Sequence, residues 1–219
     1  MRTAFVLVMT VWLGNACLAA DLVPKVEPLN VVLIVADDQH WRDYGFMGHP
    51  HVKTPHLDRF AAQSLVFPRG YVPSSLCRPS LATILTGKYP HQHGITSNDP
   101  PLPAGKTNAQ ANRDPEFLKQ REATIAKMDR AATLPRWLAP AGYRSFQTGK
   151  WWEGDFRRGG FTHGMSEGGR HGDKGLEIGR KTMAPLFDFI AHNAKRTCRS
   201  SRGTRRSCRI IPMMPPSVW

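Results

Sequence analysis

The pattern of apolar and polar residues along the chain alternates between strand and helix character. Residues 30–36 are aliphatic and β-branched throughout, which predicts a strand buried on both faces, as in a parallel sheet. Residues 65–67 predict a short second strand, and residues 142–150 predict a turn, a strand and a polar strand end. The alternation predicts an α/β sandwich, with a mainly parallel central sheet flanked by helices.

Helices are predicted where a proline stands in the first turn, and once from an amphipathic pattern. These segments are residues 54–62, 79–85, 133–139 and 180–194. Turn residues predict a loop at 98–105 that continues as a polar, exposed insertion to about residue 121. The glycine-rich stretch 156–175 predicts a long loop, a feature typical of functional regions.

The first residues have the pattern of a secretory signal peptide, which we place at residues 1–20. Arg2 is followed by an apolar run at 4–13 and by small residues at 16–20. A membrane anchor is the alternative, but the run is shorter than the roughly 20 residues that a span needs. A lipoprotein attached through Cys17 is disfavoured by Gly14, where leucine is usual. We therefore expect a periplasmic or secreted protein with no membrane segment after cleavage.

The basic character of the chain is concentrated near its end. The net charge is +13, and residues 196–219 contribute six arginines and no acidic residue. This divides the chain into a domain at 21–195 and a basic tail at 196–219. Such a tail could bind polyanions, but nothing indicates a specific nucleic-acid site. In an exported protein Cys198 and Cys208 could form a disulfide, although their spacing alone does not argue for one.

Two features carry candidate chemistry. Asp37 and Asp38 follow the first predicted strand, where carboxylates suit a hard divalent cation such as Ca²⁺ or Mg²⁺. Two solvated acids in a turn are the simpler interpretation. Cys77 stands at the start of a predicted helix, where free N–H groups favour an anion. For a lone cysteine, a buried structural thiol is the simpler interpretation.

The residues around Cys77 change this balance. The order Cys77-x-Pro79-Ser80, then a helical run and residues 86–94, resembles the signature of the sulfatase family. Residues 142–143 and 148–151 resemble a second block of that family. The resemblance covers residues 30 to about 195. It implies the alkaline-phosphatase-like α/β fold, incomplete at its C-terminus, and hydrolysis of sulfate monoesters of aryl compounds or carbohydrates.

The resemblance also implies roles for individual residues. Cys77 would be converted to formylglycine by a formylglycine-generating enzyme and would act as nucleophile and metal ligand. Asp37 and Asp38 would bind Ca²⁺, with Mg²⁺ as the alternative, and Lys150 would hold the sulfate of a sulfated small molecule or polysaccharide. A phosphomonoester or phosphonate hydrolase of the same fold, and a noncatalytic polyanion-binding remnant, remain alternatives.

The chain departs from the family pattern at three points. Leu81 stands where the signature has arginine, and Trp152 stands where the second block has histidine. His163 is our candidate to replace that histidine, since histidine is a natural general acid near neutral pH. A loop histidine without a catalytic role is an equally good interpretation. The later metal ligands of the family find no match after Lys150, so we expect a fragment of low activity.

The tail has a specific explanation that can be tested. When residues 197–212 are back-translated with GC-rich codons and the nucleotides are read in a shifted frame, the result can be a strand followed by a Pro-His pair. The family has such a block at this point. We therefore expect residues 196–219 to be an out-of-frame translation, with a disordered basic tail as the alternative. Sequencing of the gene decides between them: without sulfatase-like sequence in a shifted frame, the frameshift is wrong.

Overall fold

A four-stranded parallel sheet forms the centre of the molecule. The computed structural model describes residues 29–194, 197–199, 205–207 and 209–214, so the predicted signal peptide lies outside the described residues. The strand order is β1-β6-β2-β3, and every neighbouring pair is parallel. The strands are β1 (Leu33–Ile34), β6 (Arg209–Met214), β2 (Tyr143–Gln147) and β3 (His163–Gly164). The carboxyl ends of these strands therefore meet at one edge of the sheet.

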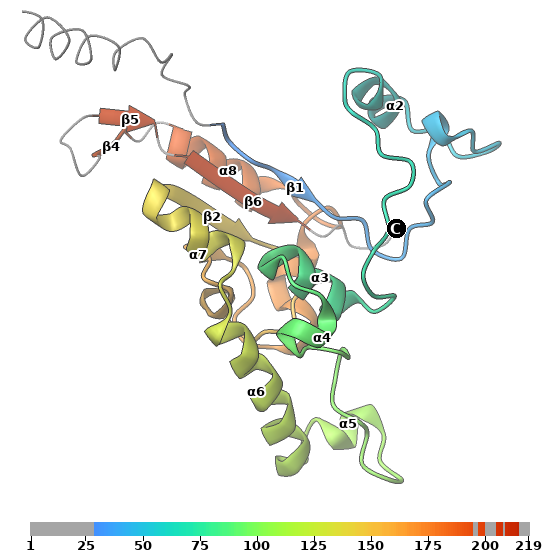
Figure 1. The fold of residues 1–219 in the computed structure, drawn as a ribbon, viewed down its shortest axis with the longest axis vertical. Helices are drawn as coiled ribbons and strands as arrows, with labels where there is room; N and C mark the ends of the chain where they lie inside the picture. The colour runs from blue at the N-terminus through green and yellow to red at the C-terminus, as the bar shows by residue number, and fades with distance from the viewer. Residues whose placement is uncertain (1–28, 195–196, 200–204, 208, 215–219) are drawn as a thin grey trace, which may run out of the picture.

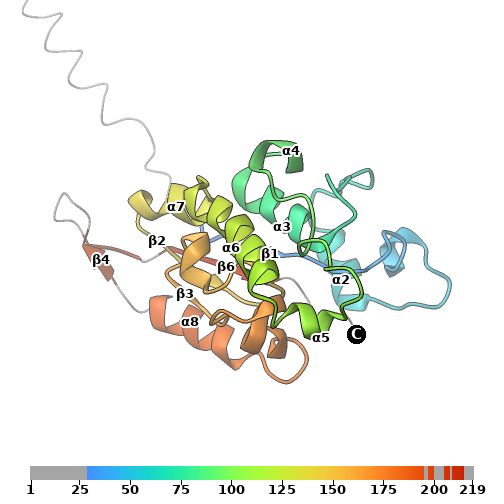
Figure 2. The same cartoon turned by 90° about the horizontal axis from the view of Figure 1, so that it is seen from below.

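Helices lie on both sides of this sheet (Figures 1 and 2). One side carries α3 (Cys77–Thr86), α6 (Pro115–Arg130) and α7 (Leu134–Leu138), and the other carries α8 (Ala184–Ala194). The larger core cluster joins the inner face of α3 to Met128 of α6 and to the tryptophans Trp151 and Trp152. A second cluster packs Phe146 of β2 against Phe189 of α8. The predicted layered α/β arrangement is therefore present.

The start of α6 follows ordinary capping rules. Asp114 is the N-cap and accepts hydrogen bonds from the N–H groups of Glu116 and Phe117, and Pro115 occupies the first turn. The remaining helical elements are η2 (Gly45–Met47), α2 (Pro55–Ala61), α4 (Pro90–His93), α5 (Asn108–Ala111), η3 (Ala139–Ala141), η4 (Phe156–Gly159) and η5 (Arg170–Glu177). None of the helices in the described part of the chain is long and apolar enough to cross a membrane.

Three local predictions were wrong. β1 is short, and its Ile34 is 69% exposed, so this strand is not buried on both faces. Residues 65–67 form no strand, and Leu65 and Phe67 are exposed. The insertion is not a continuous loop, because residues 115–130 form α6, a polar helix that buries only Phe117, Ile125 and Met128. In each case burial depends on packing partners that composition does not reveal.

Short strands also occur within the predicted tail. β4 (Thr197–Arg199) and β5 (Arg205–Ser207) pair antiparallel, and β6 lies between β1 and β2. Pro212 is opposite Phe146 in this central strand, where a residue without an N–H removes one ladder bond. The out-of-frame origin of residues 196–219 stays a prediction, and Cys208 lies outside the described residues.

The loop after β3 packs closely on the end of β2, so we expect substitution of Gly172 in this loop to destabilise the protein. Gly172 has φ +119, and a Cβ added to it would lie 2.3 Å from the carbonyl oxygen of Gly149. We expect Gly172→Ala to lower the free energy of unfolding by about 1–3 kcal/mol more than Gly168→Ala. Gly168 is the matched control, because it has φ +127 but no atom within 4 Å of the added Cβ. Equal losses in urea denaturation would show that the close approach carries no cost.

Candidate active site

The site lies where β1, β2 and α3 converge. Asp37 and Asp38 follow β1, and Lys150 follows β2 at the same edge of the sheet. Cys77 is the first residue of α3, and its N-cap residue Leu76 offers no side-chain cap. Parallel strands bring their carboxyl ends together, which explains why residues so far apart in the sequence meet here.

Four of the five predicted site residues lie close together. The ammonium group of Lys150 lies 3.8 Å from Sγ of Cys77 and forms an ion pair with the carboxylate of Asp37. One ligand atom each from Asp37, Asp38 and Cys77 lie within 4.8 Å of one another. Asp38 adopts φ +55, a left-handed conformation that is uncommon outside glycine. The fold therefore assembles a cationic side chain, two carboxylates and a thiol at one point.

The surroundings of Cys77 disfavour its thiolate. Burial raises the pKa of the Cys77 thiol, and a hydrogen bond and the charge of Asp37 act in the same direction. The charge of Lys150 opposes these effects without overcoming them. Catalytic cysteines have lowered pKa values, because the thiolate is the nucleophile. Cys77 is therefore poorly suited to act as an unmodified thiol nucleophile.

Lys150 is held in its charged form. Burial by itself would lower the pKa of Lys150, but the hydrogen bond and charge of Asp37, with Cys77 and Asp38, raise it. The side chains of Lys150 and Asp37 are 9% and 10% exposed, so water screens this pair only weakly. Lys150 is thus a charged side chain held beside residue 77. A cation in this position suits contact with an anionic group.

The donor set fits a hard divalent cation in part. Asp37 and Asp38 offer carboxylate oxygens, which Ca²⁺ and Mg²⁺ prefer, but the sulfur of Cys77 is a soft ligand. Conversion of Cys77 to an oxygen-bearing residue would make all three donors suitable. Three donors are still fewer than the about six to eight oxygens that Ca²⁺ takes, so water or further residues would have to complete the site.

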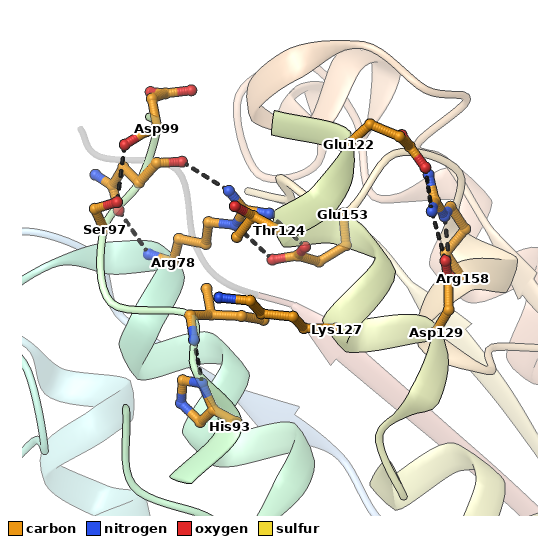
Figure 3. Close-up of polar contacts among 12 residues, drawn as sticks. Arg78, His93, Ser97, Asp99, Glu122, Thr124, Lys127, Asp129, Glu153 and Arg158 are labelled. Carbon is orange, nitrogen blue, oxygen red and sulfur yellow. Dashed lines mark hydrogen bonds and ion pairs between the residues drawn. The ribbon is translucent and has the colours of Figure 1, made fainter. Parts of the chain in front are cut away.

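Arg78, the residue after Cys77, forms a buried ion pair with Glu153 (Figure 3). Nε and Nη2 of Arg78 each donate to a carboxylate oxygen of Glu153, at 2.7 Å. Both residues are almost fully buried, at 1% and 2% exposure. Asn98 adds two contacts: its side chain accepts from the N–H of Arg78, and its carbonyl accepts from Nη1. Sequence analysis missed this pair, because 75 positions separate its members.

The two positions that depart from the family pattern are core residues. Leu81 is 8% exposed and packs in the larger core cluster with Trp152, which is 2% exposed. Neither side chain can therefore supply the charge or proton that arginine or histidine would supply. The Nε1 of Trp152 is buried and has no hydrogen-bond partner among the described residues.

The fifth predicted residue, His163, lies elsewhere on the sheet. It belongs to β3, its ring centroid is 5.2 Å from that of Phe189 in α8, and its Nδ1 lies 2.9 Å from Oγ1 of Thr162. A different histidine, His171, packs against Trp152, with ring centroids 4.7 Å apart. Sequence analysis did not single out His171, and its only signal was a place in the glycine-rich stretch.

Comparison with known proteins identifies the family. The family model described as Sulfatase matches residues 29–176. The chain belongs to the sulfatase family. It is 38% identical over 125 residues to human N-acetylgalactosamine-6-sulfatase and 38% identical over 134 residues to human arylsulfatase A. These alignments cover 57% and 61% of the chain, but only 22% of each relative. The chain therefore matches less than a quarter of the length of these sulfatases.

Solved structures support the fold. BT4656, in complex with its substrate D-glucosamine-2-N,6-O-disulfate, aligns with a TM-score of 0.56 at 21% identity. This alignment covers 87% of our chain and 34% of that one. The phosphonate monoester hydrolase of Agrobacterium radiobacter aligns with a TM-score of 0.53 at 17% identity, over 86% and 41%. The predicted sulfatase-type, alkaline-phosphatase-like fold is confirmed.

The buried ion pair predicts a large stability loss when one partner is removed. Glu153→Gln leaves the Arg78 guanidinium buried without a counter-charge, so we expect the free energy of unfolding to fall by about 3–5 kcal/mol. Glu122→Gln is the control, because Glu122 is 60% exposed and its partner Arg158 keeps a second carboxylate, Asp129. We expect the control to lose less than about 1 kcal/mol in urea denaturation.

An apolar double variant sharpens this test. Arg78→Met combined with Glu153→Leu removes both charges, so it should be less damaging than Glu153→Gln alone. If Glu153→Gln and Glu122→Gln lost the same stability, the pair would not hold the site together.

Proposed function

We propose that this chain carries the nucleophile, the metal-binding carboxylates and the sulfate-binding lysine of a sulfuric ester hydrolase. Its substrates would be sulfate monoesters, either of aryl compounds or of carbohydrates. The observation that carries the proposal is the position of the Lys150 ammonium, 3.8 Å from Sγ of Cys77 and in contact with Asp37. Membership of the sulfatase family supports the reaction class.

The raised pKa of the Cys77 thiol argues against an unmodified thiol as the nucleophile. An unmodified thiol there would be mostly protonated and would lack a second hydroxyl for release of the product. A formylglycine, made from Cys77 by a formylglycine-generating enzyme, would supply a hydrated aldehyde with one hydroxyl for attack and one for release of sulfate. The start of α3 beside it would favour negative charge, because its first N–H groups are not used within the helix.

The other residues of the site have complementary tasks. Asp37 and Asp38 would hold Ca²⁺ or Mg²⁺ together with residue 77, and the ion would supply a Lewis acid. Lys150 would fix the sulfate as a compact cation. Its raised pKa keeps it charged across the neutral range, so sulfate binding should not weaken until the solution is strongly alkaline.

The relatives guide the choice of substrate and compartment. A sulfated sugar is a reasonable candidate, because the curated relatives include N-acetylgalactosamine-6-sulfatase and a solved relative binds a disulfated glucosamine. Hydrolysis of phosphomonoesters or phosphonates is the second candidate, favoured by the fold shared with a phosphonate monoester hydrolase. The predicted signal peptide would place the protein in the periplasm or outside the cell.

Mass spectrometry of the Cys77 peptide tests the proposal. In protein exported from a host that has the converting enzyme, we expect a loss of about 18 Da relative to the thiol peptide. Cys77→Ala should abolish hydrolysis of 4-nitrophenyl sulfate, while an exposed control, His91→Gln, should leave it unchanged. We expect slow turnover even in the unaltered chain, because the described residues bring only three metal donors together at this site. An unmodified thiol, or activity retained without Cys77, would contradict the proposal.

A further inference from the structure

We propose that His171 contacts the sulfate group beside Lys150, on the side of the site where Trp152 has replaced a histidine. This inference rests on the proposed function, since it assigns a further substrate-binding residue to the same site. The ligand is the sulfate group of a sulfate monoester.

The side chains of His171 and Lys150 both lie near the indole of Trp152. The rings of His171 and Trp152 meet edge-on, with centroids 4.7 Å apart and planes at 69°. The ammonium nitrogen of Lys150 lies 5.9 Å from the centroid of the same indole. His171 and Lys150 thus share one rigid, buried neighbour, and that neighbour occupies the position of the missing histidine. The His171 imidazole therefore contacts the residue that stands at the position of the family's histidine.

Backbone hydrogen bonds hold the segment of His171 in place. The N–H of Trp151 donates to the carbonyl of His171 at 3.3 Å, and the N–H of Gly149 donates to the carbonyl of Gly175 at 3.0 Å. The segment 171–175 therefore runs along the segment that carries Lys150. These bonds hold the two backbone segments side by side.

The backbone of His171 is strained. His171 adopts φ +80 and ψ −4, a left-handed conformation that costs a non-glycine residue about 1–2 kcal/mol. Asp173 in the same turn also has positive φ, at +49. Such conformations persist where the surrounding structure enforces them, and they cluster at functional sites. Here the enforcing contact is the close approach of Gly172 to the carbonyl of Gly149.

The imidazole of His171 is available to a ligand. The side chain of His171 is half-buried, and neither ring nitrogen has a hydrogen-bond partner among the described residues. By contrast, Nδ1 of His163 is within hydrogen-bond distance of Thr162, and its ring lies against Phe189. Of these two histidines, His171 is therefore the one that packs against a neighbour of Lys150 and whose ring nitrogens have no partner among the described residues.

The electrostatic surroundings agree with this role. Burial lowers the pKa of His171, the cations Lys150 and Arg170 lower it further, and Asp37 and Asp99 oppose them. A ring in this setting is neutral near pH 7, and a neutral imidazole donates one N–H. An anion bound between His171 and Lys150 would be attracted by that N–H and would offset the two cations.

Titration with inorganic sulfate, followed by NMR of the ¹⁵N-labelled histidine rings in the full 219-residue chain, tests the assignment. We expect the ring signals of His171 to shift along a saturable curve, and those of His91 to stay unchanged. We expect His171→Gln to raise the dissociation constant for sulfate about 10-fold, as for loss of one hydrogen bond to a charged group. His91→Gln, on an exposed histidine, should bind as the unaltered chain does.

The possible outcomes separate this inference from the proposed function. If sulfate shifts the indole N–H signal of Trp152 but neither moves the His171 ring nor binds more weakly to His171→Gln, the His171 assignment is wrong and the sulfate site stands. If sulfate moves neither signal, both are wrong. If sulfate binds through His171 but Cys77 stays a thiol and no ester is cleaved, the assignment stands and the hydrolase proposal fails.

Discussion

The buried ion pair between Arg78 and Glu153 joins the two segments that carry the candidate site. Arg78 follows Cys77, and Glu153 lies three residues beyond Lys150. A bidentate guanidinium–carboxylate contact fixes both distance and direction, more strictly than a lysine could. Because the pair is almost fully buried, breaking it leaves a charge without water or partner. The 3.8 Å separation of Cys77 and Lys150 depends on this constraint.

The positive charge around this pair disfavours a further arginine at position 81. The region already holds a desolvated cation beside the signature, and Nε and Nη2 of Arg121 are also buried without a hydrogen-bond partner among the described residues. Burial lowers the pKa of Arg121, and the charges of Arg78 and Arg170 act in the same direction. A further arginine at position 81 would add positive charge to this cluster. Leucine instead packs in the larger core cluster.

Sequence singled out the four residues that the structure brings together, through two different rules. Asp37, Asp38 and Lys150 follow parallel strands, and Cys77 stands in a recognisable signature. The partnership of Arg78 with Glu153 was not predictable, since an arginine and a glutamate in separate motifs carry no sign of contact. His171 was missed because its importance arises from a left-handed turn that brings a glycine-rich loop onto the end of β2. The exposure of β1 was missed because an aliphatic run does not say which of its faces is covered.

The contact between Lys150 and Asp37 links the two binding tasks of the site. As long as Lys150 neutralises Asp37, part of its attraction for an anion is already used. A cation held by Asp37 and Asp38 would take over that neutralisation and leave the charge of the Lys150 ammonium to attract an anion beside residue 77. Cation binding and sulfate binding should therefore strengthen each other, because each relieves the charge that opposes the other. This coupling requires Lys150 to stay close to both Asp37 and Cys77. The buried pair of Arg78 and Glu153 holds together the two segments that carry Cys77 and Lys150.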